Sequence, residues 1–207
     1  MLVKPYGDRG ILLSELSDTE RSIAVGAFQK ALPDGCYEFV LGYDSLLLVG
    51  EVSQLRELDL DQIFAAAGQE PSQRSVVEID VHYDGEDLES VAEAIGASTD
   101  EVIRLHTSPV YTVRMMGFSP GFPYLDGLDE RLHLERRESP RNRIEPGTVA
   151  IGGLHAGIYT VASPGGWHLL GRTEHPLFNL DAAASPGASV TDVFALSLGD
   201  RIRFKAV

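Results

Sequence analysis

The residues that could perform chemistry are scattered through this sequence and form no recognised catalytic motif. The six histidines include no H-x-x-H or H-E-x-x-H pair, and the single cysteine, Cys36, cannot build a cysteine metal site. Neither a G-x-x-x-x-G-K-[ST] loop nor a G-x-G-x-x-G loop is present. We therefore expect no metal ion, no tightly bound cofactor and no active site that this chain completes alone.

One short segment imitates a hydrolase motif. Residues 117–121 read Gly-Phe-Ser-Pro-Gly, which matches the G-x-S-x-G nucleophile elbow of α/β-hydrolases. In that elbow, the residue after the serine supplies a backbone N–H to the oxyanion hole, and a helix follows. Here Pro120 has no N–H, and Pro123 prevents a helix. Ser119 is therefore not predicted to be a nucleophile.

The segment from Val113 to Gly127 is the part of the sequence richest in aromatic and turn-forming residues. Its prolines and glycines disfavour a helix, so we expect a strand that ends in a rigid aromatic turn. Aromatic rings supply flat apolar walls, glycines leave room beside them, and arginines bind anions. The residues predicted to line a substrate groove are Met115, Phe118, Pro120, Phe122, Tyr124, Arg141, Trp167 and Arg172.

Two polar residues are candidates for catalysis. His106 precedes the strand that leads into the aromatic turn, and Arg141 lies in a segment rich in arginine. This basic segment, residues 131–143, contains five arginines, with Glu135 and Glu138 as its acidic residues. It is either a solvated loop or a site for phosphate or carboxylate, because the planar guanidinium group suits both anions.

The elements that must position these residues begin with a small N-terminal α+β domain, residues 1–80, ordered strand, helix, strand, strand, helix. Ser17 or Asp18 is expected to cap the first helix, and Gly68 to end the second. The predicted strands cover 10–13, 39–41 and 44–49, and the predicted helices cover 18–31 and 60–67. Alternating apolar and polar residues over 75–83 predict one further strand.

Residues 81–108 are expected to form a short helical connector, so the domain boundary falls between about Asp80 and Pro109. Asp87 is a candidate cap for a helix that Gly96 ends, and Ser98 with Glu101 forms a capping box for a second helix.

The last part, residues 109–207, reads as many short strands with frequent turns and no convincing helix, which is typical of a sandwich or a closed β-barrel. Three Ser-Pro-Gly sequences, which begin at Ser119, Ser163 and Ser185, each suit a type II turn. The predicted strands are 110–116, 148–152, 157–161, 167–170, 190–196 and 201–205.

Composition excludes several classes of partner. The chain has 207 residues and a formal net charge of −14, so neither nucleic acid nor an anionic membrane is an expected ligand. No apolar run approaches the roughly 20 residues of a membrane helix, and no signal peptide is visible. We therefore expect a cytoplasmic protein.

Several motifs in order resemble the family of 5-oxoprolinase B subunits, which has also been labelled allophanate hydrolase subunit 1. The resemblance covers nearly the whole chain. The residues that carry it are Gly7–Asp8, Tyr43–Leu47, Leu105–His106, Met116–Leu125, Pro140–Arg141, Pro146–Ile151, Gly157–Tyr159, Ser163–Trp167 and Gly171–Thr173.

This resemblance implies a small N-terminal α+β domain followed by a cyclophilin-like β-barrel. It also implies a hydrolase complex, a hetero-oligomer in which the chain pairs with a related C subunit, joined in the full enzyme by an A subunit. Together these proteins would open 5-oxoproline to glutamate with ATP as cosubstrate. The ATP dependence follows from the resemblance and from no motif in this chain.

The resemblance leaves two alternatives open. The family is similar to part of the carboxyltransferase domain of urea carboxylase, which implies a subunit that processes allophanate or urea. It also includes an inhibitor of a sporulation sensor histidine kinase, which implies a protein-binding module. This chain departs from the family pattern at His155-Ala156, where Gln-Thr is common, at Thr160-Val161 and at His168. Those departures put substrate specificity in doubt more than fold or partner.

Overall fold

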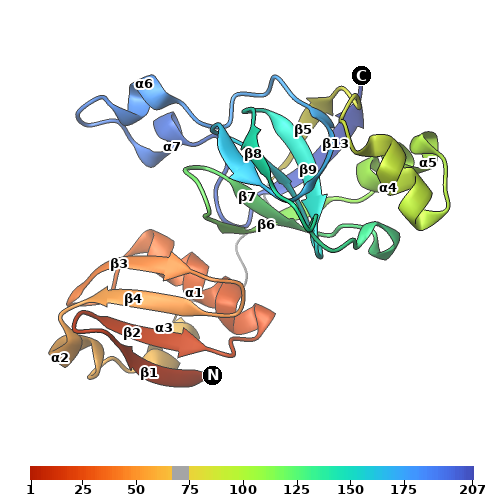
Figure 1. Ribbon diagram of the computed structural model, residues 1–207. Coiled ribbons are helices and arrows are strands. Elements are labelled where there is room, and N and C mark those ends of the chain that lie inside the picture. The colour runs from red at the N-terminus through yellow and green to blue at the C-terminus, as the bar shows by residue number, and fades with distance from the viewer. Residues whose placement is uncertain (67–74) are drawn as a thin grey trace. The chain divides into compact units, whose positions relative to one another are not determined.

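The computed structural model describes residues 1–66 and 75–207 (Figure 1). The chain forms two compact units, Met1–Arg74 and Ser75–Val207. Both mix helices with sheets, and this confirms the predicted α+β class. None of the helices in the described ranges is long and apolar enough to cross a membrane.

The N-terminal unit is built on a four-stranded antiparallel sheet with the order β1-β2-β4-β3. Its strands are β1 (Leu2–Tyr6), β2 (Gly10–Ser14), β3 (Cys36–Leu41) and β4 (Leu46–Gly50), and its helices are α1 (Asp18–Lys30), α2 (Val52–Leu55) and α3 (Leu60–Ala66). The strand β1 was not predicted, because all five of its residues are exposed and an exposed strand lacks the apolar run that marks a buried one.

Local sequence signals set the bounds of α1. The Ser17 hydroxyl accepts the Glu20 N–H, and the Glu20 carboxylate accepts the Ser17 N–H at 2.8 Å, which completes a capping box. Phe28 then packs against Phe39 of β3, with ring centres 5.8 Å apart. The predicted end of the second helix at Gly68 lies outside the described residues.

The C-terminal unit contains a seven-stranded sheet with the order β12-β9-β10-β7-β6-β13-β5. The strands are β5 (Val76–Val81), β6 (Tyr111–Met116), β7 (Pro123–Asp126), β9 (Thr148–Gly152), β10 (His155–Ile158), β12 (His168–Arg172) and β13 (Arg201–Ala206). Backbone hydrogen bonds between His82 and Arg172, each 2.9 Å, join its two edges. The sheet is therefore nearly closed, as the predicted β-barrel requires.

The strand β5 places the division between the units earlier than the sequence analysis did. It pairs in parallel with β13 along its whole length, from Arg201 opposite Val76 to Ala206 opposite Val81. Ile79 and Val81 are fully buried in the barrel core. The strand thus belongs to the C-terminal unit, whereas the predicted boundary followed it.

Two helices, α4 (Leu88–Ile95) and α5 (Thr99–Thr107), pack against the barrel as predicted for the connector (Figure 1). Gly96 ends α4 in the left-handed conformation, and the Ser98 hydroxyl accepts the Glu101 N–H at the start of α5. The predicted side-chain cap by Asp87 is wrong, because its carboxylate makes no hydrogen bond to α4 and bonds elsewhere.

Three predictions for the last part of the chain need correction. The segment predicted as strand 190–196 begins with a helical turn, α7 (Val190–Val193), which Ser189 and Asp192 cap. A second turn, α6 (Leu180–Ala183), and a 3-10 turn, η1 (Glu130–Leu132), contradict the expected absence of helix. The Ser119 and Ser185 turns are confirmed by glycines with φ of 74° and 84°, but Ser163 begins a strand, β11 (Ser163–Gly165).

Candidate functional site

The predicted aromatic residues gather on the outer face of the barrel sheet. Side chains alternate along each strand, so Leu125 and Ala156 point into the barrel while Tyr124 points outward. Gly157, which pairs with Tyr124, lies at an outward-facing position. A short ribbon of β8 (Arg141–Ile144) and β11 lies beside them and closes a second apolar cluster. We call the outer rings the aromatic cluster: Phe118, Phe122, Tyr124, Tyr159 and Trp167.

Phe122 is the centre of this cluster. Its ring centre lies 5.1 Å from Tyr124, 5.2 Å from Tyr159 and 5.4 Å from Trp167, and all three pairs meet edge to face. Such pairs each stabilise by about 0.5–1.5 kcal/mol beyond the burial of their area. Phe122, Tyr159 and Trp167 are buried, so these three rings belong to the core and cannot contact a ligand.

Two glycines make the close packing possible. A Cβ atom at Gly157 would lie 2.9 Å from both Phe122 and Trp167, and one at Gly152 would lie 2.8 Å from three atoms of the Trp167 ring. Real Cβ contacts are not this short. Gly152 and Gly157 therefore form the floor against which the Trp167 ring packs.

The exposed part of the cluster is its rim. Phe118 is 60% exposed although its ring lies 5.4 Å from Phe122, and its φ of 70° is unusual for a residue other than glycine. Such a conformation costs about 1–3 kcal/mol and is retained where the surrounding structure imposes it. Tyr124, which also contacts Phe122, is half-buried. Phe118 and Tyr124 are the two cluster rings that a ligand could touch.

The two remaining apolar candidates lie next to this rim. Met115 stands opposite Tyr124 on the neighbouring strand and is half-buried. Pro120 is exposed in the Ser119 turn, where its carbonyl accepts the Thr160 hydroxyl at 2.6 Å. The sequence thus placed Met115, Phe118, Pro120, Phe122, Tyr124 and Trp167 in one region.

Arg141 has a different role from the predicted anion site. Both of its terminal nitrogens bind the carboxylate of Asp87 at 2.9 Å, and Arg137 donates to the same carboxylate at 2.7 Å. Asp87 is buried and also accepts the Leu169 N–H. Burial raises the pKa of Asp87, but the Arg141 and Leu169 hydrogen bonds with the two arginine charges outweigh it and lower that pKa. This ion-pair hub ties β8 to the start of α4.

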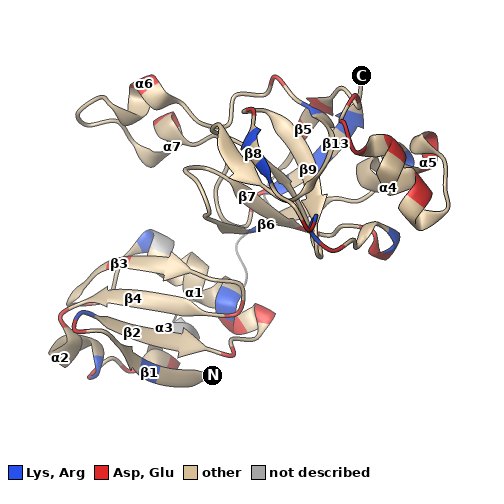
Figure 2. Cartoon of the chain, in the orientation of Figure 1, with Lys and Arg blue, Asp and Glu red and all other residues tan. Residues whose placement is uncertain are grey.

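Arg172 is also paired within the chain. Its Nε lies 2.9 Å from the carboxylate of Asp84, and both side chains are largely exposed. Asp84 and Asp87 belong to the same loop after β5, so the two predicted arginines hold this loop in place from β12 and β8. Neither guanidinium group lies in the aromatic cluster. Figure 2 shows the basic residues on β8.

His106 is a core residue. Its side chain has no exposed surface, its ring stacks on Phe204 with centres 4.6 Å apart, and Nδ1 lies 2.7 Å from the Tyr83 hydroxyl. Burial lowers the pKa of His106 to about 3, so the ring is neutral at pH 7. A side chain with no accessible surface cannot touch a substrate, and the structure therefore gives His106 a packing role.

Sequence reasoning missed two features of this face. Arg136 lies over the Trp167 ring, with its guanidinium carbon 5.9 Å from the ring centre. Asp126 lies 3.2 Å from Arg114 and 3.0 Å from Nδ1 of His155, whose ring meets Tyr124 edge to face. The register of β7 against β10 could have suggested the second pairing, but no sequence signal predicts that register.

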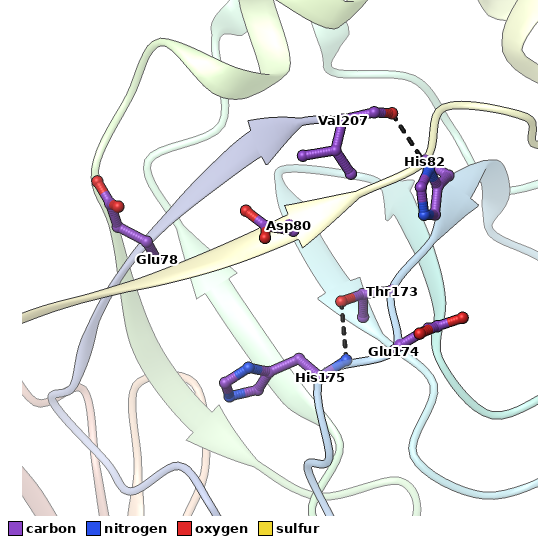
Figure 3. A pocket seen from close by; sticks show the side chains of 7 residues that line it. All are labelled: Glu78, Asp80, His82, Thr173, Glu174, His175 and Val207. Atoms are coloured by element: carbon purple, nitrogen blue, oxygen red, sulfur yellow. Dashed lines mark hydrogen bonds between the residues drawn. The ribbon is translucent and has the colours of Figure 1, made fainter.

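A separate pocket of about 360 Å³ lies where the two edges of the barrel meet (Figure 3). Glu78 and Asp80 line it from β5, and Thr173, Glu174 and His175 line it from the chain after β12. Figure 3 also shows His82 bonded to the Val207 carbonyl, with Nδ1 3.2 Å from the oxygen. The part of the chain that the structure describes has no group of three acidic, histidine or cysteine side chains arranged to hold a metal ion.

The fold also occurs in solved structures of other proteins. The urea carboxylase of Kluyveromyces lactis contains the same architecture, with a TM-score of 0.69 at 20% identity over 99% of this chain and 21% of that chain. The family model named carboxyltransferase domain, subdomain C and D, matches residues 1–187, and the chain belongs to this family.

Closer relatives confirm the resemblance found in the sequence. The 5-oxoprolinase B subunit of Haemophilus influenzae is 40% identical over 148 residues, which cover 70% of this chain and 66% of the relative. That of Bacillus subtilis is 48% identical over 108 residues, which cover 51% of this chain and 45% of the relative. The chain thus matches about half to two thirds of the length of these relatives.

One solved structure, TTHA0988, matches 96% of this chain with a TM-score of 0.79 and 35% identity. The match covers 40% of the TTHA0988 chain. The same two units therefore also occur inside a longer polypeptide.

Proposed function

We propose that this chain is the B subunit of an ATP-dependent 5-oxoprolinase, which opens the lactam 5-oxoproline to glutamate. The observation that carries this proposal is the 40–48% identity to three relatives that bear the name of this 5-oxoprolinase component. The protein acts in the cytoplasm as one component of a hetero-oligomeric hydrolase and is inactive by itself.

The geometry of the aromatic rim supports a share in a substrate site. Phe118 and Tyr124 offer flat apolar surface of a size that suits a five-membered lactam ring. Neither Ser119 nor the buried His106 offers a nucleophile or base to such a ligand. The chain would therefore bind and orient the lactam, while another protein of the complex supplies the groups that react.

The partner that completes the site is a C subunit, with an A subunit in the full enzyme. The chain of TTHA0988, in which these two units make up only part of one polypeptide, supports association with further protein. ATP would bind to a partner as cosubstrate, because the sequence contains no recognised nucleotide loop. Transfer of the terminal phosphoryl group of ATP to the lactam oxygen would release ADP and activate the amide carbon. Attack by one water and cleavage of the C–N bond would then give an acyl phosphate, which a second water would hydrolyse to glutamate and phosphate.

Reconstitution tests this proposal. We expect the chain mixed with the A and C subunits to convert 5-oxoproline to glutamate with ATP hydrolysis, and no conversion when any one component is omitted. Phe118→Ala should lower turnover, whereas Tyr37→Ala, an equally exposed ring of the N-terminal unit, serves as the matched control.

Three results would contradict the proposal. The first is full activity without this chain, and the second is no activity with all three components. The third is turnover of allophanate or urea in place of 5-oxoproline, which would assign the chain to the alternative hydrolase. Inhibition of a sensor histidine kinase by the chain alone would instead support a protein-binding role.

A further inference from the structure

One arginine of the basic segment differs from its neighbours. Four of the five arginines in residues 131–143 form ion pairs with carboxylates: Arg131, Arg137, Arg141 and Arg143. Within the described residues, Arg136 pairs with no carboxylate, although Glu135 and Glu138 flank it. It lies over the Trp167 ring instead, and the residue is exposed.

Tyr124 carries the second unused group. Its ring is fixed by contacts to Phe122 at 5.1 Å, Trp167 at 5.6 Å and His155 at 5.9 Å. In the described parts of the chain, its hydroxyl has no hydrogen-bond partner. The ring contacts therefore hold the phenol of Tyr124 in place, while its hydroxyl bonds to no described protein group.

These two groups flank the same tryptophan. Gly152 lies against one face of the Trp167 ring, so Arg136 must cover the opposite face, while Tyr124 meets the ring at its edge. Both also act on the neighbouring Tyr159 hydroxyl: burial raises the pKa of Tyr159, the Arg136 charge lowers it and Tyr124 raises it. Arg136 and Tyr124 therefore both contact the ring of Trp167.

We propose that Arg136 and Tyr124, which both pack on the buried Trp167 ring, form the site that binds the carboxylate of the substrate. This inference rests on the proposed function, because 5-oxoproline carries one carboxylate on its lactam ring. Arg136 would donate two N–H groups to the carboxylate and Tyr124 its O–H, and the ring would lie against the rim formed by Phe118. The cation–π contact orients the guanidinium group before the ligand arrives.

The site defines a substrate class. It selects small cyclic amides that carry a negative charge next to the ring nitrogen, and it gives no advantage to an uncharged lactam of the same size. A hydrogen bond to a charged group contributes far more to affinity than a neutral contact does. Preference for 5-oxoproline over 2-pyrrolidinone, the same lactam without the carboxylate, therefore measures the site directly.

The experiment uses the complex reconstituted with the A and C subunits, and it measures the KM for 5-oxoproline and the inhibition constant of 2-pyrrolidinone. Arg136→Gln should raise the KM by about 10- to 100-fold and leave the inhibition constant unchanged. Tyr124→Phe should raise the KM by about 5-fold with an unchanged melting temperature, because the hydroxyl stabilises no protein contact. Arg143→Gln removes an equally charged side chain of the same segment and should change neither constant.

The outcomes separate the two proposals. A complex that converts 5-oxoproline, but in which Arg136→Gln keeps the preference over 2-pyrrolidinone, would overturn the carboxylate site and leave the proposed function standing. A complex that never converts 5-oxoproline would overturn the proposed function and this inference together. A fall in melting temperature in Tyr124→Phe would show that the hydroxyl has a structural partner, which contradicts the site.

Discussion

The arginines of the basic segment have two different kinds of partner, a buried carboxylate or an aromatic ring. Arg137 and Arg141 converge on Asp87, whose side chain is 4% exposed, and the pair fixes how β8 meets α4. Arg136 lies on the ring of Trp167 with no carboxylate beside it in the described structure. Residue type and sequence position are nearly the same in both places. The partner of an arginine, and the burial of that partner, therefore decide whether the arginine stabilises the fold or remains available to a ligand.

Removal of the buried carboxylate should have the largest effect on stability. Asp87→Ala leaves two arginines and the Leu169 N–H without their shared acceptor, and we expect a loss of about 3–5 kcal/mol in urea unfolding. The control is Asp84→Ala, which breaks the exposed pair with Arg172 and should cost at most about 1 kcal/mol. Equal losses in the two variants would mean that Asp87 is no hub.

The pH dependence of this hub follows from the direction of the pKa shift. The pKa of Asp87 is lowered in the folded protein. Its carboxylate therefore stabilises the fold at any pH above about 3.9, the pKa of aspartate in the unfolded chain. That contribution disappears as the pH falls through the lower folded value. Asp87→Ala should therefore approach the stability of the original chain in strong acid.

The floor of the aromatic cluster should respond to one added methyl group. Gly157→Ala would place a Cβ atom 2.9 Å from Phe122 and Trp167, and we expect a loss of about 1–3 kcal/mol with a change in tryptophan fluorescence. Gly26→Ala is the matched control, because nothing lies within 4 Å of a Cβ atom there. Wild-type stability and fluorescence in Gly157→Ala would show that the packing of Phe122 and Trp167 does not require a glycine at this position.

His106 is a buried polar group in the core of the barrel, and its burial should make the stability of the protein depend on pH. Its folded pKa of about 3 lies below the unfolded value of about 6.5, so the unfolded chain binds the extra proton first. Protonation of His106 in the unfolded chain should therefore lower the free energy of unfolding by about 1.4 kcal/mol per pH unit as the pH drops from 6.5 towards 3. His106→Phe should remove this slope and His133→Phe should not; an unchanged slope in His106→Phe would contradict the burial.

The sequence predicted what short-range rules control. The capping residues of α1 and α5, the alternation along β5 and the Ser119 turn all depend on residues within a few positions of each other. The aromatic residues could also be placed together, because most of them belong to one short segment. These features account for the fold class and for the apolar part of the candidate site.

The errors involve partners that are distant in sequence. Arg141 and Asp87 are separated by 54 positions, so nothing near Arg141 predicts that its charge is already used. The ring of His106 stacks on Phe204 of β13, which lies almost 100 residues further along the sequence. The apolar residues after Ser189 suit a strand by composition, but the Ser189–Asp192 cap makes them a helical turn. Tertiary contacts decided the first two cases, and a local cap decided the third.

The most direct test compares Arg136→Gln with Arg137→Gln, two neighbouring substitutions that remove the same charge. Unfolding free energy and KM for 5-oxoproline are measured for both variants in the reconstituted complex. We expect Arg136→Gln to raise the KM by about 10-fold or more at wild-type stability, and Arg137→Gln to lower the unfolding free energy at wild-type KM. The opposite pattern, or equal effects of both substitutions, would contradict the division between a structural and a ligand-binding arginine.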